Sequence, residues 1–141
     1  KIAMKLSSSK IDLKLLSLGL LFIRISFGAL MIVNHGWMKI VKFETLKLNF
    51  FNFLGLGPQL SLTLAIIAEI LCSILLIFGL YTRLALIPLI ITMIVAASAH
   101  NLEIFGDAEL AFMYLIVFIF LFIVGPGDKS IDARMNKKTY Y

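Results

Sequence analysis

Long apolar stretches separated by short polar segments make up most of the chain. Four stretches are long enough for helices, and none alternates polar and apolar positions as the strands of a membrane barrel do. A helix of roughly 20 residues crosses the ~30 Å hydrocarbon layer of a bilayer. The pattern predicts an all-α membrane protein, a four-transmembrane-helix bundle in a single domain, residues 1–141. Its helices are expected at about residues 15–36, 60–80, 83–100 and 106–124, and its tails at 1–14 and 125–141.

Turn-forming residues agree with these boundaries. Pro58 follows the sequence GLG and suits the first turn of the second helix. Thr82, in the turn GLYTR, is a candidate N-cap of the third helix, and GPG at 125–127 ends the fourth. The long first loop, 38–59, is rich in phenylalanine. We expect it either to lie flat in the membrane interface, as amphipathic segments do, or to cap the bundle as an ordered loop.

The composition favours lipid as the surrounding medium. The chain is 61% hydrophobic and 15% charged, whereas soluble domains are about half apolar and about a quarter charged. Nine Lys and Arg residues fall in the tails and the middle turn, against three in the first loop. Because cytoplasmic segments carry the excess of positive charge, both termini are expected in the cytoplasm and the first loop outside it. The chain is then a multi-pass protein of the cytoplasmic (inner) membrane.

Several other classes fit the sequence less well. The basic residues lie beside apolar runs and not on one face, so no nucleic-acid partner is expected. The single cysteine, Cys72, excludes an internal disulfide. The first apolar run follows a basic tail, as in a signal peptide, but it is of span length and contains Arg24. Signal cores have about 7–15 residues, so we expect a retained first helix.

Two ionisable residues lie deep in the apolar runs. Arg24 is nine residues from Leu15, and Glu69 is nine residues from Leu60. At 1.5 Å per residue, each lies ~13 Å deep from its own side of the membrane. Because an unpaired charge there costs at least about 2.5–3.5 kcal/mol, the sequence predicts an Arg24–Glu69 ion pair inside the bundle. The pair is either purely structural or part of a site, in which Arg24 holds an anionic or carbonyl group of a lipid-soluble ligand and Glu69 tunes it or relays protons.

Polar residues also gather at the expected outer end of the bundle. His35 lies on the same helical stripe as Arg24, and Lys39 is one turn beyond it. His100 ends the third helix, and acidic residues follow it at Glu103, Asp107 and Glu109. This cluster either binds a ligand or only makes interfacial hydrogen bonds. The candidates for ligand binding or proton relay are Arg24, His35, Lys39, Glu69, His100 and Glu109. No HxxxH or ExxH spacing occurs, so no metal site is expected.

The order and spacing of these residues resemble the DoxX family of small four-helix membrane proteins. The matching segments cover residues 20 to about 132 and read LLFIRISFGALMIVNHGWMKI, AIIAEILCSILLIFGLYTRLA, SAHN, DAELAFMYL and GPGDKSID. By position, the six candidates take the family's polar places, together with Arg83 and Asp132 as structural polar residues. The resemblance implies a four-helix membrane protein of bacterial or archaeal type, often associated with redox proteins and in some relatives linked to quinones.

Three functions are compatible with this sequence. The first is a redox-associated subunit that binds a quinone, with Arg24 and a histidine bonded to the ring carbonyls and Glu69 carrying protons. Electrons would then come from a redox or membrane-complex partner. The second is a non-catalytic assembly or structural subunit whose polar cluster docks another protein. The third is a small transporter or channel, which requires oligomerisation. No phosphate loop, dinucleotide fingerprint or nucleophile elbow occurs, so the motifs assign no enzymatic activity.

Overall fold

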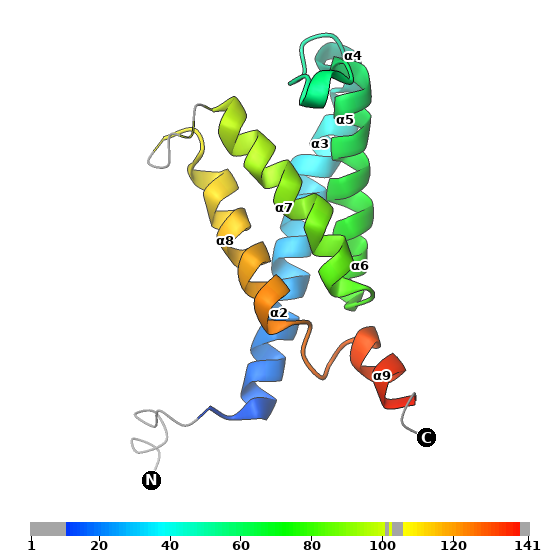
Figure 1. The fold of residues 1–141 in the computed structure, drawn as a ribbon, viewed down its shortest axis with the longest axis vertical. Helices are drawn as coiled ribbons and strands as arrows, with labels where there is room; N and C mark the ends of the chain where they lie inside the picture. The colour runs from blue at the N-terminus through cyan, green and yellow to red at the C-terminus, as the bar shows by residue number, and fades with distance from the viewer. Residues whose placement is uncertain (1–10, 101, 103–105, 139–141) are drawn as a thin grey trace.

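Apolar helices form the body of the protein in the computed structural model, which describes residues 11–100, 102 and 106–138 (Figure 1). The first helix runs through α2 (Leu13–Met31), the π-helical segment η1 (Ile32–Gly36) and α3 (Trp37–Val41). The second runs through α5 (Pro58–Ile67), the π-helical η3 (Ala68–Cys72) and α6 (Ser73–Phe78). The third is α7 (Thr82–Ala99) and the fourth is α8 (Glu109–Val124). Within the described residues the chain is helical and contains no strand, as the hydrophobic pattern predicts.

Three of these helices are long and apolar enough to cross a membrane, namely 13–41, 58–78 and 82–99, while α8 is shorter, with 16 residues. The first helix therefore continues well past the expected end at residue 36. Pro58 occupies the first turn of α5, and α8 ends at Gly125, which has a φ of 90° that favours glycine.

The remaining elements lie at the two ends of the bundle. The short helices α4 (Phe43–Leu46) and η2 (Phe53–Gly55) belong to the first loop and define what we term the loop end. The start of α2 and the short helix α9 (Ile131–Lys138) lie at the opposite end (Figure 1). The two described ends of the chain are therefore on the same side of the bundle.

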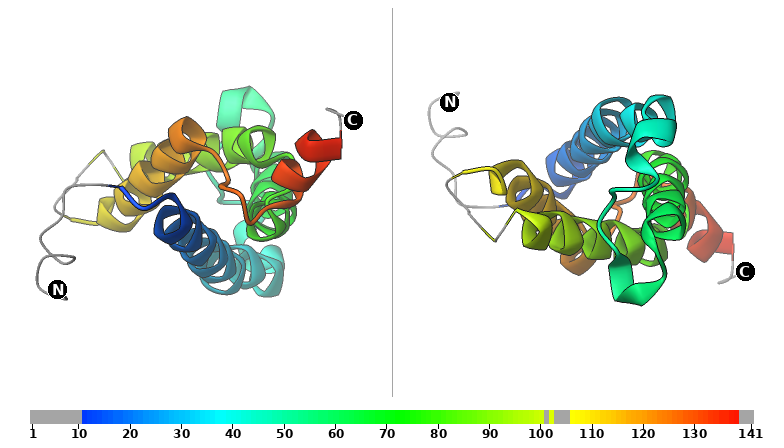
Figure 2. Two further views of the ribbon diagram at one scale, coloured as in Figure 1. Left: turned by 90° about the horizontal axis from the view of Figure 1, so that it is seen from below. Right: turned by 90° about the horizontal axis from the view of Figure 1, so that it is seen from above.

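The helices pack as two pairs. The α7 helix lies along α8, and α2 lies along α6. Views along the long axis show α7 and α8 on one side, α2 and α3 on the other, and the second helix between them (Figure 2). The largest buried cluster joins all four helices through Met31, Leu76, Leu89 and Phe118, whose side chains are inaccessible. Gly28 allows the close approach of α2 and α6, because a Cβ there would meet Ile77 Cγ1 at 2.6 Å.

A segment after α8, residues 125–132, folds back onto the bundle, and we call it the C-terminal clasp. The Asp132 amide donates to the Gly79 carbonyl at 2.9 Å. The Asp132 carboxylate accepts hydrogen bonds from the amides of Tyr81 and Thr82 at 2.7 and 2.9 Å and from Thr82 Oγ1 at 2.8 Å. The predicted N-cap role of Thr82 is therefore wrong. Thr82 is the first residue of α7, and the cap is the remote side chain of Asp132.

Arg24 anchors the clasp from the first helix. Its side chain is fully buried, and Nη2 donates to the Lys129 carbonyl at 2.6 Å. The Lys129 amide in turn donates to Ser17 Oγ at 3.3 Å. Ser17 lies on α2, seven residues before Arg24. Gly79 makes room for the guanidinium, because it has a left-handed φ of 65° and a Cβ there would overlap Arg24 Nη1. The clasp therefore covers the buried charge of the first helix.

Replacing Gly79 by alanine should loosen this end of the protein. The new Cβ would be strained by the positive φ and would displace both Arg24 and Ser130, and single effects of this kind cost about 1–3 kcal/mol. We expect a clear fall in the thermal unfolding midpoint of the purified protein in micelles. Gly19→Ala is the matched control. Beyond its own helical turn, no atom of the described residues lies within 4 Å of the Cβ position, and alanine favours the helix. Equal midpoints for the two variants would contradict the role assigned to Gly79.

Candidate functional site

Two π-helical segments face each other where the first and second apolar helices cross. η1 contains His35 and Gly36, and η3 contains Glu69 and Cys72. The segments are in contact, and a Cβ on Gly36 would come within 2.5 Å of Ile70 Cγ1 and 3.5 Å of Glu69 Cβ. A π-helical turn inserts an extra residue into an α-helix and re-aims the side chains that follow, and such turns are frequent at functional sites.

An ion pair lies beside these segments. Lys39 Nζ contacts both carboxylate oxygens of Glu69, at 2.8 Å to Oε1 and 2.7 Å to Oε2. The Glu69 side chain is only 3% exposed and that of Lys39 20%. Lys39 is one α-helical turn past η1, so the extra residue in η1 contributes to turning its side chain toward Glu69. The acid in the middle of the second helix is thereby neutralised by the first helix.

The predicted Arg24–Glu69 ion pair is wrong. Arg24 donates to the clasp, and Glu69 is bonded to Lys39. The packing explains this result, because Gly36 and not Arg24 lies opposite Glu69. Twelve residues separate the two positions on the first helix, which is ~18 Å along its axis. The prediction counted the depth of each residue from the end of its own apolar run, and this count does not show how far the two helices are shifted along each other.

A cavity of about 660 Å³ opens next to the ion pair, between the second helix, α7 and the first loop. Most of its wall is apolar and comes from α5, η3 and α7. The polar and ionisable residues that line it are His35, Lys39, Asn49, Ser61, Glu69, Thr92, His100 and Asp107. Three of the candidates, His35, Lys39 and Glu69, thus meet at its deep end, and Cys72 also lines its wall.

The His35 ring is held against the fourth helix. It packs edge-on against Tyr114 of α8, with ring centroids 5.3 Å apart. Tyr114 also packs edge-on against Phe27, at 5.5 Å, and it is 3% exposed. Among the described residues, His35 Nε2 has no hydrogen-bond partner although it is buried. Sequence reasoning missed Tyr114, for which the available signal was a single phenol within a long run of aliphatic and phenylalanine residues.

The other residues of the predicted outer cluster do not all reach the cavity. His100 and Asp107 are exposed and line the mouth of the cavity at the loop end. Glu109 is exposed at the start of α8 and does not line the cavity. Glu103 lies outside the described residues. Arg83 is at the clasp end, where Nε donates to the Phe122 carbonyl at 3.1 Å and Nη2 to the Ile123 carbonyl at 3.3 Å.

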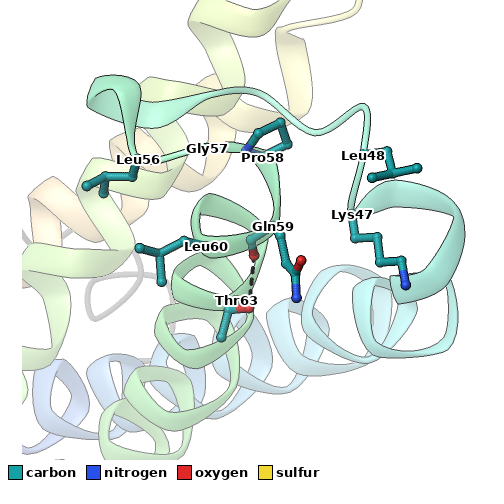
Figure 3. A pocket seen from close by; sticks show the side chains of 8 residues that line it. All are labelled: Lys47, Leu48, Leu56, Gly57, Pro58, Gln59, Leu60 and Thr63. Atoms are coloured by element: carbon teal, nitrogen blue, oxygen red, sulfur yellow. Dashed lines mark hydrogen bonds between the residues drawn. The ribbon is translucent and has the colours of Figure 1, made fainter.

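A second hollow lies on the outside of the first loop, between α4 and the start of α5 (Figure 3). Its volume is about 500 Å³, and its one ionisable lining residue is Lys47. Gln59 and Thr63 face it, with Thr63 Oγ1 donating to the Gln59 carbonyl at 2.9 Å. Because Lys47 already pairs with Glu44, this hollow offers no group for chemistry, and the cavity beside Lys39 is the candidate site.

The cavity has the features of a site for a lipid-soluble molecule. Sites for small molecules commonly have about 300–1,000 Å³ and apolar walls with a few placed polar groups. Lys39 and Glu69 sum to zero charge, so the deep end offers hydrogen-bond donors without a net charge. Arg24 does not line this cavity. Within the described part of the chain, no group of three or more His, Cys, Asp or Glu side chains is arranged to hold a metal ion.

Comparison with known proteins gives consistent matches. The family model DoxX matches residues 19–102. The chain is 33% identical to inner membrane protein YqjF of Escherichia coli over 130 residues, which covers 89% of this chain and 98% of that protein. It is also 33% identical to an uncharacterized protein of Haemophilus influenzae over 127 residues, 84% of this chain and 92% of the relative. No solved structure gives a significant match.

The buried ion pair should respond to mutation differently from an exposed one. Lys39→Met leaves the Glu69 carboxylate buried without its partner, which typically costs about 3–5 kcal/mol. The double variant Lys39→Met/Glu69→Met replaces both charges by apolar groups of similar size and should recover most of that loss. Lys47→Met is the control, because it breaks the Lys47–Glu44 pair, in which Glu44 is 79% exposed, and should cost at most about 1 kcal/mol. Free energies of unfolding in mixed micelles test this, and equal losses for Lys39→Met and Lys47→Met would refute the assigned role.

Proposed function

The chain is an integral membrane protein of the DoxX family, and from this premise we propose that it binds a lipid-soluble ligand of the quinone class in the cavity beside Lys39 and Glu69. The observation that carries the proposal is the position of the ion pair and His35 at the deep end of a cavity whose wall is mostly apolar. Intramembrane ionisable residues that face a cavity commonly mark a ligand or proton pathway.

The proposal includes a membrane placement. The described ends of the chain share one side of the bundle (Figure 1), and the tails and middle turn carry nine basic residues against three in the first loop. The positive-inside rule then assigns both termini to the cytoplasm and the loop end to the opposite side. YqjF is named an inner membrane protein, and we assign the same membrane to this chain. α8 completes a four-helix membrane bundle, and its 16 residues span ~24 Å, so thinner bilayer or its flanking residues make up the difference.

The residues of the cavity have separate roles in this proposal. Lys39 presents N–H groups to an acceptor oxygen while Glu69 fixes the position of its ammonium group. The His35 ring, held by Tyr114, is the second candidate to meet a ligand oxygen. His100 and Asp107 connect the mouth to the aqueous side and are the candidates for proton exchange. Arg24 has no role here, because it is bonded to the clasp.

The donor set fits a quinone. A quinone ring is flat, uncharged and mostly apolar, and it accepts hydrogen bonds at two carbonyl oxygens. His35 Nε2 is a buried polar atom with no hydrogen-bond partner among the described residues, and the His35 ring packs edge-on against Tyr114. When bound, a quinone would supply two-electron and two-proton carrier chemistry. We propose that the chain serves as a redox-associated subunit, with a partner protein exchanging the electrons.

Binding can be measured through Trp37, the only tryptophan, which is two residues from both His35 and Lys39. Quinones quench tryptophan emission, so titration of ubiquinone or menaquinone into nanodiscs should quench Trp37 in a saturable manner. Lys39→Met/Glu69→Met should abolish saturation, because it removes the polar groups and keeps the volume. The matched control is Lys47→Met/Glu44→Met, which removes the exposed ion pair outside the cavity and should bind like the unaltered protein.

The opposite result would favour the alternative function. Non-saturable quenching that is the same for all three proteins, together with no quinone in solvent extracts of the purified protein, would refute the quinone proposal. The polar groups would then belong to an assembly or structural subunit. A protein partner that is lost from the native complex on Asp107→Asn would establish that alternative.

A further inference from the structure

The wall of the cavity is open toward the side of the bundle. Leu64 and Ile67 of α5 and Ile91 of α7 all line the cavity. The same residues are 43%, 49% and 42% exposed. A side chain that lines a cavity and is also exposed to this extent stands at an opening. These three residues therefore mark a lateral opening between α5 and α7.

The helix packing explains why this opening exists. α7 packs against α8, η3 and α6, and α5 is not among its principal neighbours. Small side chains, Ala65 on α5 and Ala96 on α7, also form part of the wall and leave it wide. α7 is in contact with η3 and α6 and diverges from α5 toward the loop end (Figure 1).

The opening lies at the depth of the hydrocarbon. Leu64 and Ile67 are six and nine residues from the start of α5 at Pro58, which is ~9 and ~14 Å. Ile91 is eight residues from the end of α7 at Ala99, which is ~12 Å. Glu69, two residues past Ile67, lies slightly deeper. All three residues thus lie within ~14 Å of the loop-side end of their own helix, and they line the same cavity. Under the proposed placement they belong to the half of the membrane on the loop side.

We propose that the ligand enters through this opening from the hydrocarbon of the loop-side leaflet, and that its tail stays between α5 and α7 while its head contacts Lys39 and Glu69. This inference rests on the proposed function and specifies the class of ligand, an uncharged head on a single long apolar tail. The head is uncharged because Lys39 and Glu69 already neutralise each other. The tail is apolar because Leu64, Ile67 and Ile91 form the opening. A ligand without a tail would pass through the opening on its way in but would not occupy it when bound, so its equilibrium affinity should not depend on the width of the opening.

The test narrows the opening without touching the ion pair. Leu64→Phe/Ile91→Phe adds two rings at the opening. The matched control, Leu71→Phe/Ile94→Phe, makes the same changes at residues of similar exposure, 52% and 48%, that do not line the cavity. Two probes are titrated in nanodiscs with Trp37 quenching as the readout: a benzoquinone with a decyl tail, and tetramethylbenzoquinone, which has no tail. Neither variant introduces a second tryptophan.

The proposal expects one combination of results. The decyl quinone should bind the variant with the narrowed opening about tenfold more weakly than the control variant, which corresponds to the lost burial of roughly two methylene groups. Tetramethylbenzoquinone should bind both variants equally, which also shows that both are folded. Equal binding of the decyl quinone to both variants would overturn the lateral opening. If Lys39→Met/Glu69→Met still abolished binding in that case, the proposed function would stand without it.

Two other results would also overturn the inference. An anionic amphiphile such as laurate that displaces the decyl quinone at equal affinity would exclude selection of an uncharged head. A bilayer phospholipid that remains bound through purification and is lost in Leu64→Phe/Ile91→Phe but not in the control would assign the opening to an acyl chain. If neither quinone binds the unaltered protein, the proposed function itself fails. This result can be distinguished from a failure of the lateral opening alone, in which the unaltered protein still binds the decyl quinone.

Discussion

The hydrogen-bonded contact between Lys39 and Glu69 is the interaction on which the loop half of the molecule depends. A carboxylate that is 3% exposed on an apolar helix must be neutralised, because an isolated charge in hydrocarbon is costly. Lys39 neutralises it with both oxygens within 2.8 Å, and this requires the first helix to continue through η1 into α3. The length of the first helix and its π-helical turn bring Lys39 to Glu69, and the ion pair adds to the glycine contacts that fix the register of the first two helices. Removing either partner alone would leave the other in the position that the bilayer tolerates least.

Arg24 has the same problem at the clasp end and a different solution. Among the residues that the structure describes, no carboxylate pairs with it directly. Its Nη2 donates to the carbonyl of Lys129, a group that the clasp brings back from 105 residues further along the chain. Asp132 holds the clasp in place by capping α7, and Gly79 leaves the space for the guanidinium. One end of the bundle is therefore closed by a network of hydrogen bonds that mostly join side chains to backbone groups. At the loop end, Lys39 and Glu69 form an ion pair with each other, and a cavity lies beside this pair.

Hydrophobic pattern alone predicts the helices, because lipid requires apolar runs whatever the packing. It also gives the start of α5 at Pro58 and the end of α8 at GPG. The partner of Arg24 could not be predicted this way. Depth counted from the ends of an apolar run ignores the stagger between helices, which depends on where glycines such as Gly28 and Gly36 meet their neighbours. The π-helical turns leave no mark in the composition, although η1 contributes to turning Lys39 toward Glu69 and η3 carries Glu69 itself. The capping of α7 by Asp132 joins residues 50 positions apart, so no local signal could reveal it.

Closure of one end and opening of the other are physically linked. A four-helix bundle that splays at one end loses side-chain contacts there, and it keeps its fold only if the remaining contacts fix the relative positions of the helices. The clasp does this for α2, α7 and α8 at once, since Arg24 lies on the first, Asp132 caps the second, and the segment itself continues from the third. Arg83 adds to the same closure by binding the last carbonyls of α8. With the helices fixed there, α5 and α7 can diverge at the loop end, and the ion pair lies at the point where they begin to separate. The two charged residues that apolar helices should avoid, Arg24 and Glu69, thus lie where this protein is closed and where it encloses a cavity.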